Sequence, residues 1–428
     1  MGTDVAHGFD NSTKTTENMK NLKRFLIMML AGTALTATAQ MTYTVKVTNT
    51  MKQVRNDQPV VLQLADDNEV QAALVTLDGK EVPSQLDDLN EDGFYDELCF
   101  LANLDKKEQQ KFEVKLFTTG EPREYSPRTF AQLLLRNPKV KEKNKQDFYL
   151  TEITVPKELE DPYHMVHQHG VAFESELIAI RVYYDKRQTL DLYGKYNKRL
   201  ELKDTQFYTT DEQKAQGYGD DILWCGQTFG FGAFRGWDGK QPTMVDDVTN
   251  RTQRIVAKGP VRTIVELEDR GWKADDRLPR LNMTVRYTLY AGHRDLDVDV
   301  FFNRDVTDRN FSTGLINVKN SEEFTDHKGL RGLWGTDFPA GAKDSIAHPR
   351  ETVGMGIFVP DQFRRSEEPA NKDNYGFVVG TDNAQIHYKL VYTSAKETFG
   401  YKNSKQWFEF LKQWRKELEH PVVIEYNN

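Results

Sequence analysis

Cysteine is scarce in this sequence, since only Cys99 and Cys225 occur in 428 residues. A secreted fold held together by several disulfides is therefore excluded. One bridge between the two is chemically allowed in an oxidising compartment, although each cysteine lies in an apolar stretch. Apolar runs after the first 40 residues are also shorter than the roughly 20 residues that cross a bilayer. We therefore expect no permanent membrane anchor and no integral membrane contact.

Positive charge is in deficit as well. The 57 lysines and arginines are outnumbered by 65 aspartates and glutamates, which gives a formal net charge of −8 at pH 7. A net negative protein repels polyanions, so we expect no nucleic-acid partner. The sequence also lacks a glycine-rich phosphate-binding loop and the Gly-x-Ser-x-Gly turn of the α/β-hydrolases. Nucleotide binding and serine-hydrolase chemistry are therefore not indicated.

The first residues are organised as an export signal. Three basic residues precede an apolar run at 25–35, and the small residues Ala37 and Ala39 form a cleavage site. We therefore assign residues 1–39 to a leader with a signal peptide at 19–39. No cysteine follows the cleavage site, so a lipid anchor has no acceptor there. The mature protein is expected to be periplasmic or secreted.

Alternating apolar and polar residues in short runs, separated by turn-forming clusters, follow the leader. This period of two is typical of antiparallel strands with one solvated face. The pattern predicts an N-terminal β-sandwich module at 40–120. Three prolines and many charges then mark 121–147 as a linker or crossover.

Strand patterns recur every ten to fifteen residues in the remaining segment, 148–428, without the regular α/β alternation of a doubly wound fold. One helix is predicted at 404–419, with Ser404 as its N-cap and a single apolar stripe. The predicted class is therefore mainly β. It combines a large antiparallel β-sandwich of the supersandwich type with the small N-terminal β module and one C-terminal helix.

An acidic loop offers oxygen ligands at alternate positions, with Gly93 among them. A hard cation such as Ca²⁺ needs this arrangement to be wrapped by a short loop. The match to an EF-hand is partial, because Cys99 stands where the twelfth-position glutamate would be and strands flank the loop. The alternative is an acidic turn held by hydrogen bonds from its own backbone. The candidate ligands of a structural calcium are Asp88, Asn90, Asp92, Asp96 and Glu97.

Histidine, tyrosine and arginine are concentrated between residues 163 and 195. In an extended segment His167 and His169 would share one face, where imidazoles can act as acid, base or hydrogen-bond partner. A tyrosine beside a cation can be acidified, and an arginine can clamp a carboxylate. Zinc held by the histidines with Glu174 or Glu176 is an alternative without a strong signature. The candidate catalytic residues are His167, His169, Glu174, Glu176, Arg181, Tyr183 and Tyr193.

The segment 217–239 is unusually rich in glycine and aromatic residues. Its glycines are wrongly spaced for a nucleotide fingerprint, but they allow close approach of backbone or ligand, and its tryptophans offer flat faces for sugar rings. A sharply turning core hairpin is the alternative. The candidate substrate-binding residues are Lys195, Trp224, Arg235, Trp237 and His293.

A further acidic run follows His293. Alternation places Asp295, Asp297 and Asp299 on one face of a predicted strand, with apolar residues on the other. Such a face could gather carboxylates for acid and base chemistry or for a cation. A solvated sheet face without chemistry is the alternative.

Three ordered segments, 169–195, 219–239 and 259–262, are similar to the DUF4861 family of Bacteroidetes. The resemblance extends over most of the mature chain. It implies an exported, β-rich protein, often encoded or fused beside unsaturated glucuronyl or rhamnogalacturonyl hydrolases in polysaccharide-degradation loci. It supplies no catalytic residues. Residues 398–401 are a weakened version of the Gly-Trp-rich segment expected before the helix.

Together these features favour a carbohydrate-active enzyme, either a glycoside hydrolase or a polysaccharide lyase, that acts on uronate-containing plant or algal oligosaccharides. Hydrolysis requires paired carboxylates, whereas elimination requires a cation, a base and an acid. For elimination the candidates are Arg181 or Arg235, His167 or His169, and Tyr183 or Tyr193. For hydrolysis the candidates are Glu174 or Glu176 with Asp295. The alternatives are a non-catalytic glycan-binding protein of a polysaccharide-utilisation system and a structural envelope protein.

Overall fold

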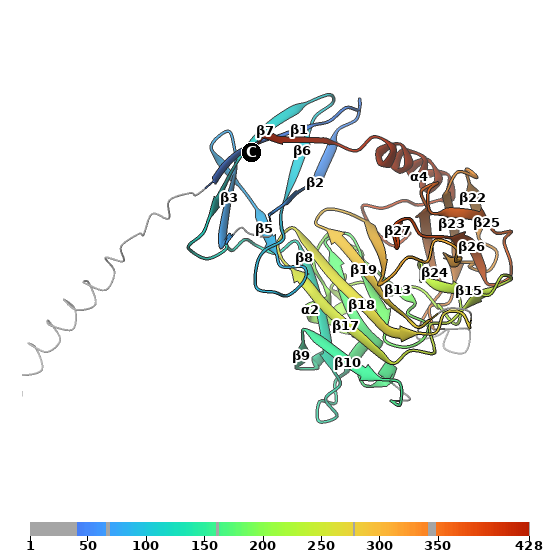
Figure 1. Cartoon of the computed structure of the whole chain (residues 1–428). Coiled ribbons are helices and arrows are strands. Elements are labelled where there is room, and N and C mark those ends of the chain that lie inside the picture. Colours follow the sequence, from blue (N-terminus) through green and yellow to red (C-terminus); the bar gives the residue numbers. More distant parts are fainter. Residues whose placement is uncertain (1–40, 66–68, 160–161, 277–278, 341–347, 428) are drawn as a thin grey trace, which may run out of the picture. The chain divides into compact units, whose positions relative to one another are not determined.

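The computed structural model describes residues 41–65, 69–159, 162–276, 279–340 and 348–427, drawn in colour in Figure 1. The predicted leader, 1–39, lies outside the described residues. The described residues are 48% strand and 9% helix, so the predicted mainly β class is confirmed. No helix of the described residues is long and apolar enough to cross a membrane.

Two sheets form the N-terminal module. Alternation along their strands turns side chains such as Val45, Val47 and Val114 inward, where they are fully buried in a shared apolar core. In spatial order, the first sheet consists of β28 (Val423–Asn427), β1 (Met41–Thr48), β7 (Gln109–Phe117), β3 (Ala72–Leu77) and β4 (Lys80–Val82). The second sheet consists of β2 (Arg55–Gln63), β6 (Glu97–Leu104) and β5 (Ser84–Asp87).

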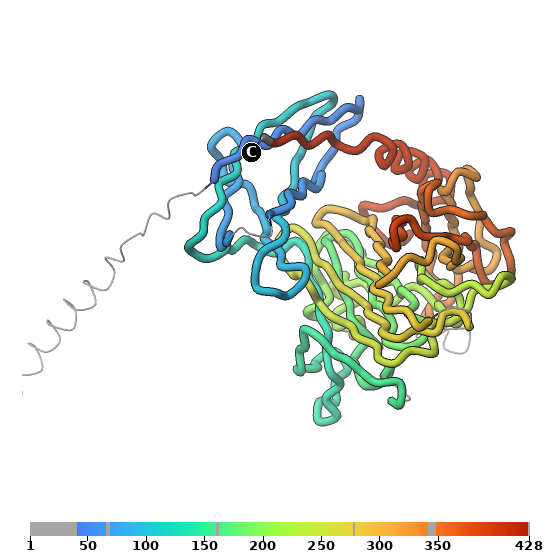
Figure 2. Tube along the Cα trace, in the orientation of Figure 1, coloured from blue at the N-terminus to red at the C-terminus, as the bar shows by residue number. Residues whose placement is uncertain are grey.

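The last strand of the chain belongs to this first sheet. β28 pairs antiparallel with β1, from Thr44 opposite Asn427 to Thr48 opposite Val423. Figure 2 shows the red C-terminal segment running back to lie beside the blue N-terminal strands. The module is therefore built from both ends of the described chain.

Three further antiparallel sheets make up the rest of the fold. The nine-stranded sheet consists of β10 (Glu152–Pro156), β17 (Asn250–Lys258), β18 (Arg262–Trp272), β19 (Leu281–Tyr290), β20 (Asp295–Phe302), β27 (Gln385–Ser394), β24 (Glu351–Phe358), β23 (Leu330–Asp337) and β22 (Glu322–Thr325). The six-stranded sheet consists of β14 (Asp220–Asp221), β13 (Leu190–Gly194), β12 (Ala179–Tyr183), β11 (Gly170–Ser175), β8 (Thr129–Leu135) and β9 (Phe148–Leu150). The five-stranded sheet consists of β16 (Pro242–Thr243), β15 (Arg235–Trp237), β21 (Phe311–Ile316), β26 (Asn374–Val379) and β25 (Arg364–Glu367).

The nine-stranded sheet packs against the other two, which gives the predicted large sandwich. Phe173 on β11 stacks on Tyr287 of β19, and Phe302 of β20 stacks on Phe311 of β21 with ring centroids 4.7 Å apart. These rings belong to one extended buried core. Such a core explains why strand patterns recur so regularly after residue 148.

Cys99 and Cys225 are both free and buried, so the allowed disulfide is not formed. Residues 121–147, predicted as a linker, contribute β8 to the six-stranded sheet and the short 3-10 turn η1 (Lys143–Lys145). The boundary placed in that segment stays a prediction.

The C-terminal helix is α4 (Ser404–Glu419), which buries Trp407, Leu411 and Trp414. Its N-cap is Asn403 and not the predicted Ser404, because the Asn403 side chain accepts the backbone N–H of Gln406. The other helical elements are short. They are η2 (Pro162–His164), η3 (His167–His169), α2 (Leu202–Thr205) and α3 (Asp211–Ala215).

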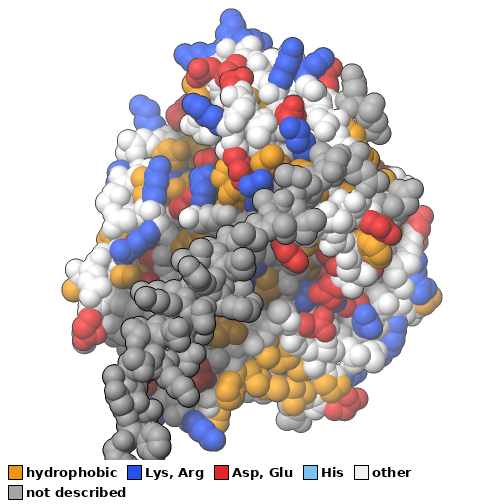
Figure 3. Space-filling model, turned by 90° about the vertical axis from the view of Figure 1, so that its left-hand side faces the viewer, with side chains coloured by type: hydrophobic (Ala, Val, Ile, Leu, Met, Phe, Trp, Pro, Cys, Tyr) orange, Lys and Arg blue, Asp and Glu red, His pale blue; other side chains and the backbone are white. Residues whose placement is uncertain are grey.

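On the face drawn in Figure 3, basic and acidic side chains are interspersed among the visible described residues. That part of the surface is therefore not a continuous basic patch of the kind that follows a nucleic-acid backbone.

Candidate functional site

The outer face of the six-stranded sheet carries the polar residues predicted for chemistry. On β12, Ile180 and Val182 point into the core, so alternation places Arg181 and Tyr183 on the opposite face. Arg181 and Tyr183 therefore share this face of the sheet. The chain segment that contains α2 and α3 covers part of this face.

Arg181 connects two carboxylates beneath that cover. Its Nε and Nη2 donate to Asp191 Oδ2 at 3.0 and 2.6 Å, and Nη2 also donates to Asp221 Oδ2 at 2.8 Å. The hydroxyl of Tyr183 donates to the same Asp191 oxygen at 2.6 Å. The remaining Arg181 nitrogen, Nη1, is buried and has no hydrogen-bond partner among the described residues. A buried donor of this kind calls for a water or a ligand group.

Asp221 differs from Asp191 because its side chain remains 23% exposed. Burial and, next, the nearby Asp191 charge raise the pKa of Asp221 well above its ordinary value, and the Arg181 charge opposes this shift. Asp191 is fully buried and accepts from both Arg181 and Tyr183. Asp221 is therefore the carboxyl of the pair that can hold a proton, as a general acid must.

A tyrosine and a histidine form a second pair beside Arg181. His169 Nδ1 lies 3.2 Å from the Tyr163 carbonyl oxygen, and its Nε2 lies 3.2 Å from the Tyr208 hydroxyl. Because a carbonyl can only accept, Nδ1 carries the proton and Nε2 accepts from Tyr208. Burial lowers the pKa of His169 to about 4, so the imidazole is neutral at pH 7. Burial also raises the pKa of Tyr208, while the Arg181 charge opposes that rise.

The backbone around this pair is strained. Gln168 and His169 have φ values of 50° and 66°, and Gln206 and Phe207 have values of 46° and 68°. Such left-handed residues other than glycine cluster at functional sites, where the surrounding structure holds them. The prediction of an extended segment with His167 on the same face as His169 is wrong, because η3 is a turn with Gln168 in a left-handed conformation.

His167 lies next to the pair and is 6% exposed. Its ring centroid is 5.2 Å from that of Tyr208, and burial lowers the pKa of His167 to about 4. Its Nε2 is buried without a hydrogen-bond partner among the described residues. Of the seven predicted catalytic residues, the structure brings together His167, His169, Arg181 and Tyr183.

Asp221 and Tyr208 both line a cavity of about 530 Å³. Lys143 extends over the Tyr208 ring with Nζ 5.2 Å from its centroid, and Lys214 pairs with Asp220 at 2.6 Å. The described residues that line the cavity are Glu142, Lys143, Asn144, Phe207, Tyr208, Thr209, Thr210, Lys214, Asp220, Asp221, Pro339, Ala340 and His348. The cavity therefore combines three acidic residues, a phenol hydrogen-bonded to His169, and two lysines.

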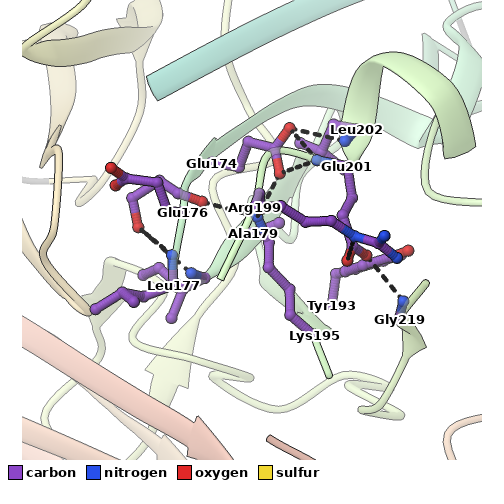
Figure 4. Close-up of polar contacts among 12 residues, drawn as sticks. Glu174, Glu176, Leu177, Ala179, Tyr193, Lys195, Arg199, Glu201, Leu202 and Gly219 are labelled. Atoms are coloured by element: carbon purple, nitrogen blue, oxygen red, sulfur yellow. Dashed lines mark hydrogen bonds and ion pairs between the residues drawn. The ribbon is translucent and has the colours of Figure 1, made fainter. Parts of the chain in front are cut away.

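Glu174 and Lys195 lie in a separate, fully buried ion pair (Figure 4). Lys195 Nζ donates to Glu174 Oε2 at 2.5 Å and to the carbonyl oxygens of Ser175 and Arg199, which uses its three protons. The Glu174 carboxylate also accepts the backbone N–H groups of Glu201 and Leu202. In this arrangement the pair holds the segment after β13 against β11.

Replacing Lys195 with methionine is expected to lower the free energy of unfolding by about 3–5 kcal/mol, because Glu174 would keep a buried charge without its counter-ion. Urea unfolding measures this change. The double variant Lys195→Met with Glu174→Leu should recover much of the loss. A single variant as stable as the wild type would contradict a structural role for this pair.

The other predicted catalytic residues lie elsewhere on the same sheet. Glu176 accepts from Arg128 Nε and from the Gly292 N–H. Tyr193 is buried, its hydroxyl lies 2.9 Å from the Thr209 hydroxyl, and burial raises its pKa well above the ordinary value. Neither residue lines the 530 Å³ cavity.

The predicted substrate-binding residues are dispersed. Arg235 is 1% exposed, and its Nη2 donates to Thr189 Oγ1 and the Thr228 carbonyl at 3.0 Å each. Burial lowers the pKa of Arg235 to about 10. Trp237 lines a different cavity of about 300 Å³. Trp224 is 58% exposed.

His293 lines a third cavity of about 400 Å³. Its Nε2 donates to the Asp57 carbonyl at 2.7 Å, and its Nδ1 lies 2.8 Å from Asp295 Oδ1. Burial alone would lower the pKa of His293, but the Asp295 charge and these hydrogen bonds raise it. The predicted common face of Asp295, Asp297 and Asp299 is present on β20, where each lies near a cation or a histidine.

The acidic loop at 88–97 is closed by its own backbone. Asp88 accepts the N–H groups of Glu91 and Gly93, and Asp96 accepts that of Leu89. Among the residues that the structure describes, no group of three or more His, Cys, Asp or Glu side chains is placed to hold a metal ion. Calcium therefore stays a prediction for this loop.

Calcium binding is tested most directly by measuring the stability of the protein with and without the ion. If the loop binds the ion, free calcium at a hundredfold its Kd is expected to raise the free energy of unfolding by about 2.7 kcal/mol. EDTA should reverse the gain, and Asp92→Ala should abolish it. Equal melting curves with calcium and with EDTA would reject the prediction.

None of the predicted site residues lines the cavity, so sequence reasoning missed all of its lining, including Lys143, Tyr208, Lys214 and Asp221. Asp221 stands in the paired acids after Gly219, but no periodicity links it to Arg181, some 40 positions earlier. Tyr208 follows Phe207 in a segment without strand or long-helix pattern. A run of turn and aromatic residues between two predicted strands is the one signal that could have drawn attention to it.

Comparisons with known proteins give one family. A family model described as "Domain of unknown function (DUF4861)" matches residues 47–424. Two solved structures are similar at 11% identity each: an α-mannosidase from Enterococcus faecalis V583 and a protein of glycosyl hydrolase family 38 from Enterococcus faecalis. Their TM-scores are 0.47 and 0.49.

Each of these alignments covers 96% of this chain, and they cover 49% and 51% of the two solved chains. The chain thus spans about half the length of these proteins. No curated protein sequence matches it. A Bacteroidetes origin and a polysaccharide-degradation locus stay predictions. Since the family model covers most of the residues from β1 to β28, the chain belongs to the DUF4861 family.

Proposed function

We propose that this protein is an exported carbohydrate-active enzyme that cleaves uronate-containing oligosaccharides by β-elimination in the 530 Å³ cavity. The observation that carries the proposal is the joint placement of Asp221 and the Tyr208–His169 pair around Arg181. Elimination requires a protonated acid, a base and positive charge in one site. All three requirements are met by residues of this cluster.

The base would be Tyr208. Its proton passes to His169 Nε2, and the phenolate oxygen takes the proton from C5 of the uronate. His169 is suited to this transfer because it is neutral and its Nε2 is already the acceptor. The electrons of the C5–H bond form the C4–C5 double bond as the C4–O bond breaks.

The acid would be Asp221, which donates its proton to the leaving oxygen and becomes a carboxylate. Positive charge is needed at the sugar carboxylate, because the intermediate carries extra negative charge there. Lys143, which lines the cavity over the Tyr208 ring, would supply it, and the Arg181 charge lies beneath the cavity. Transfer of one proton from His169 through Tyr208 to water, and of one from water to Asp221, restores the starting state.

Hydrolysis is the second candidate, because Asp220 also lines the cavity beside Asp221. A glycosidase would use Asp221 as the acid and a second carboxylate as base or nucleophile. Asp220 is paired with Lys214, which makes it less suited to that role. A non-catalytic glycan-binding protein is the remaining alternative, favoured by the exposure of Trp224.

The test is incubation of the mature protein with pectic, ulvan-like and glucuronoxylan oligosaccharides, with absorbance at 235 nm and product chromatography recorded together. New absorbance at this wavelength reports the unsaturated product and would support elimination. New products without the absorbance would support hydrolysis. Retention in glycan affinity gels without any product would support the binding protein.

A further inference from the structure

Trp224 is the most exposed large apolar side chain of the described residues, with 58% of its surface open to solvent. Burying such a side chain against a partner would be favourable. An aromatic ring kept in water on a fixed support is typical of a recognition surface, since it contributes a large contact area at little cost in conformational entropy.

The loop that carries Trp224 is fixed to the candidate site. Its neighbours Ile222 and Leu223 are buried in the core. Cys225 Sγ lies 3.4 Å from Asp191 Oδ1. Asp191 is the carboxylate that also binds Arg181, so the indole is presented from the same framework as the reacting groups.

Arg187 provides a second connection. Its Nη1 donates to the Gly226 carbonyl at 3.5 Å, and its guanidinium lies 4.8 Å from the ring centroids of both Tyr163 and Tyr183. Tyr163 in turn stacks on His169 with centroids 3.8 Å apart. Arg187 and Tyr163 thus connect the Trp224 loop to His169, which accepts the proton of the proposed base.

Trp224 is close to Asp221 along the chain. Trp224 follows Asp221 by three residues, so their Cα atoms are at most about 11 Å apart even in a fully extended chain. The indole is not part of the 530 Å³ cavity lining. It therefore lies outside the cavity lining, and its Cα is close enough to that of Asp221 for the indole to contact a sugar beyond the two joined by the cleaved bond.

We infer that Trp224 forms an outer subsite that stacks on a sugar ring beyond the two joined by the cleaved bond, and makes the site selective for longer oligosaccharides over disaccharides. This inference rests on the proposed function, because Asp221 defines the reacting position. Stacking uses the face of the ring and not the indole N–H, so phenylalanine should replace tryptophan with a modest loss.

The experiment compares kcat/KM on a uronate disaccharide and on the matching tetrasaccharide for the wild type, Trp224→Ala and Trp224→Phe. Trp224→Ala is expected to lower the value for the tetrasaccharide by about three- to tenfold and to leave the disaccharide within about twofold. Tyr149→Ala is the matched control, since Tyr149 is an exposed aromatic residue on β9. An unchanged ratio between the two substrates in Trp224→Ala would overturn the inference.

Failure of the proposed reaction is separable from failure of the subsite. If the wild type cleaves neither substrate, calorimetric binding of the tetrasaccharide is measured for the wild type and Trp224→Ala. Weaker binding by the variant would retain the stacking surface and reject the reaction. Equal binding would reject the subsite.

Discussion

Asp221→Asn is expected to lower kcat on a uronate oligosaccharide by about 10²–10⁴-fold, because asparagine cannot donate the proton that the leaving oxygen needs. Its amide oxygen can still accept from Arg181 Nη2, so the network beneath the cavity should persist. Initial rates at 235 nm measure kcat, and urea unfolding checks stability.

Asp220→Asn is the matched control for this variant, since the two acids adjoin and line the same cavity. Under elimination it should retain kcat within about tenfold, whereas under hydrolysis both variants should be severely impaired. A fully active Asp221→Asn enzyme would refute the assignment of the acid.

The pH profile supplies a second readout of the same assignment. Because burial and the Asp191 charge raise the pKa of Asp221, the proton needed for donation is kept to a higher pH than in an ordinary aspartate and is lost as pH rises further, which gives an alkaline limb. His169 has a pKa of about 4 and loses its capacity to accept as pH falls through that value, which gives an acidic limb. Residual activity of Asp221→Asn should lack the alkaline limb.

Tyr208→Phe is expected to lower kcat by about 10²–10⁴-fold with a smaller change in KM, because the ring under Lys143 is kept and the hydroxyl is lost. His169→Gln should reduce kcat in the same direction, since it removes the group that takes the phenolic proton. Single-turnover absorbance at 235 nm separates the chemical step from binding.

The control for the hydroxyl deletion is Tyr218→Phe, which removes a hydroxyl that donates to Asp204 away from the cavity lining. It should retain full activity. If Tyr208→Phe stays within about threefold of the wild type, the base lies elsewhere, and His167 would be the next residue to replace.

The strands and the C-terminal helix could be predicted from the sequence because each depends on a pattern within a short segment. Along β20, apolar residues alternate with Asp295, Asp297 and Asp299, and this period of two suffices to predict a strand with one solvated face. The C-terminal helix followed in the same way from a 3.6-residue stripe. The pairing of β28 with β1 left no comparable trace, because strand order depends on contacts between distant segments.

The candidate site could be predicted from the sequence only in part. Arg181 and Tyr183 lie on one strand, so their common face follows from alternation. Asp221, which binds Arg181, comes from the two-residue strand β14, and Tyr208, which binds His169, comes from the covering segment. Neither stretch has a regular period, so only the fold shows that these residues come together.

Glu174 and Lys195 were predicted as site residues, but the structure places them in a structural role. Their residue types suit catalysis, yet the structure uses them in a buried pair whose hydrogen bonds are satisfied internally. Residue type alone does not distinguish a buried pair from a reactive one, because burial and partners decide which of the two it is.

The position of β28 has a consequence for biosynthesis. β1 emerges from the ribosome among the first of the described residues, but the strand that covers its edge is made among the last. Until then β1 presents unpaired N–H and C=O groups, which can pair with another chain. The first sheet of the N-terminal module therefore stays incomplete until β28 has been made, and the exposed edge of β1 is open to aggregation during that interval.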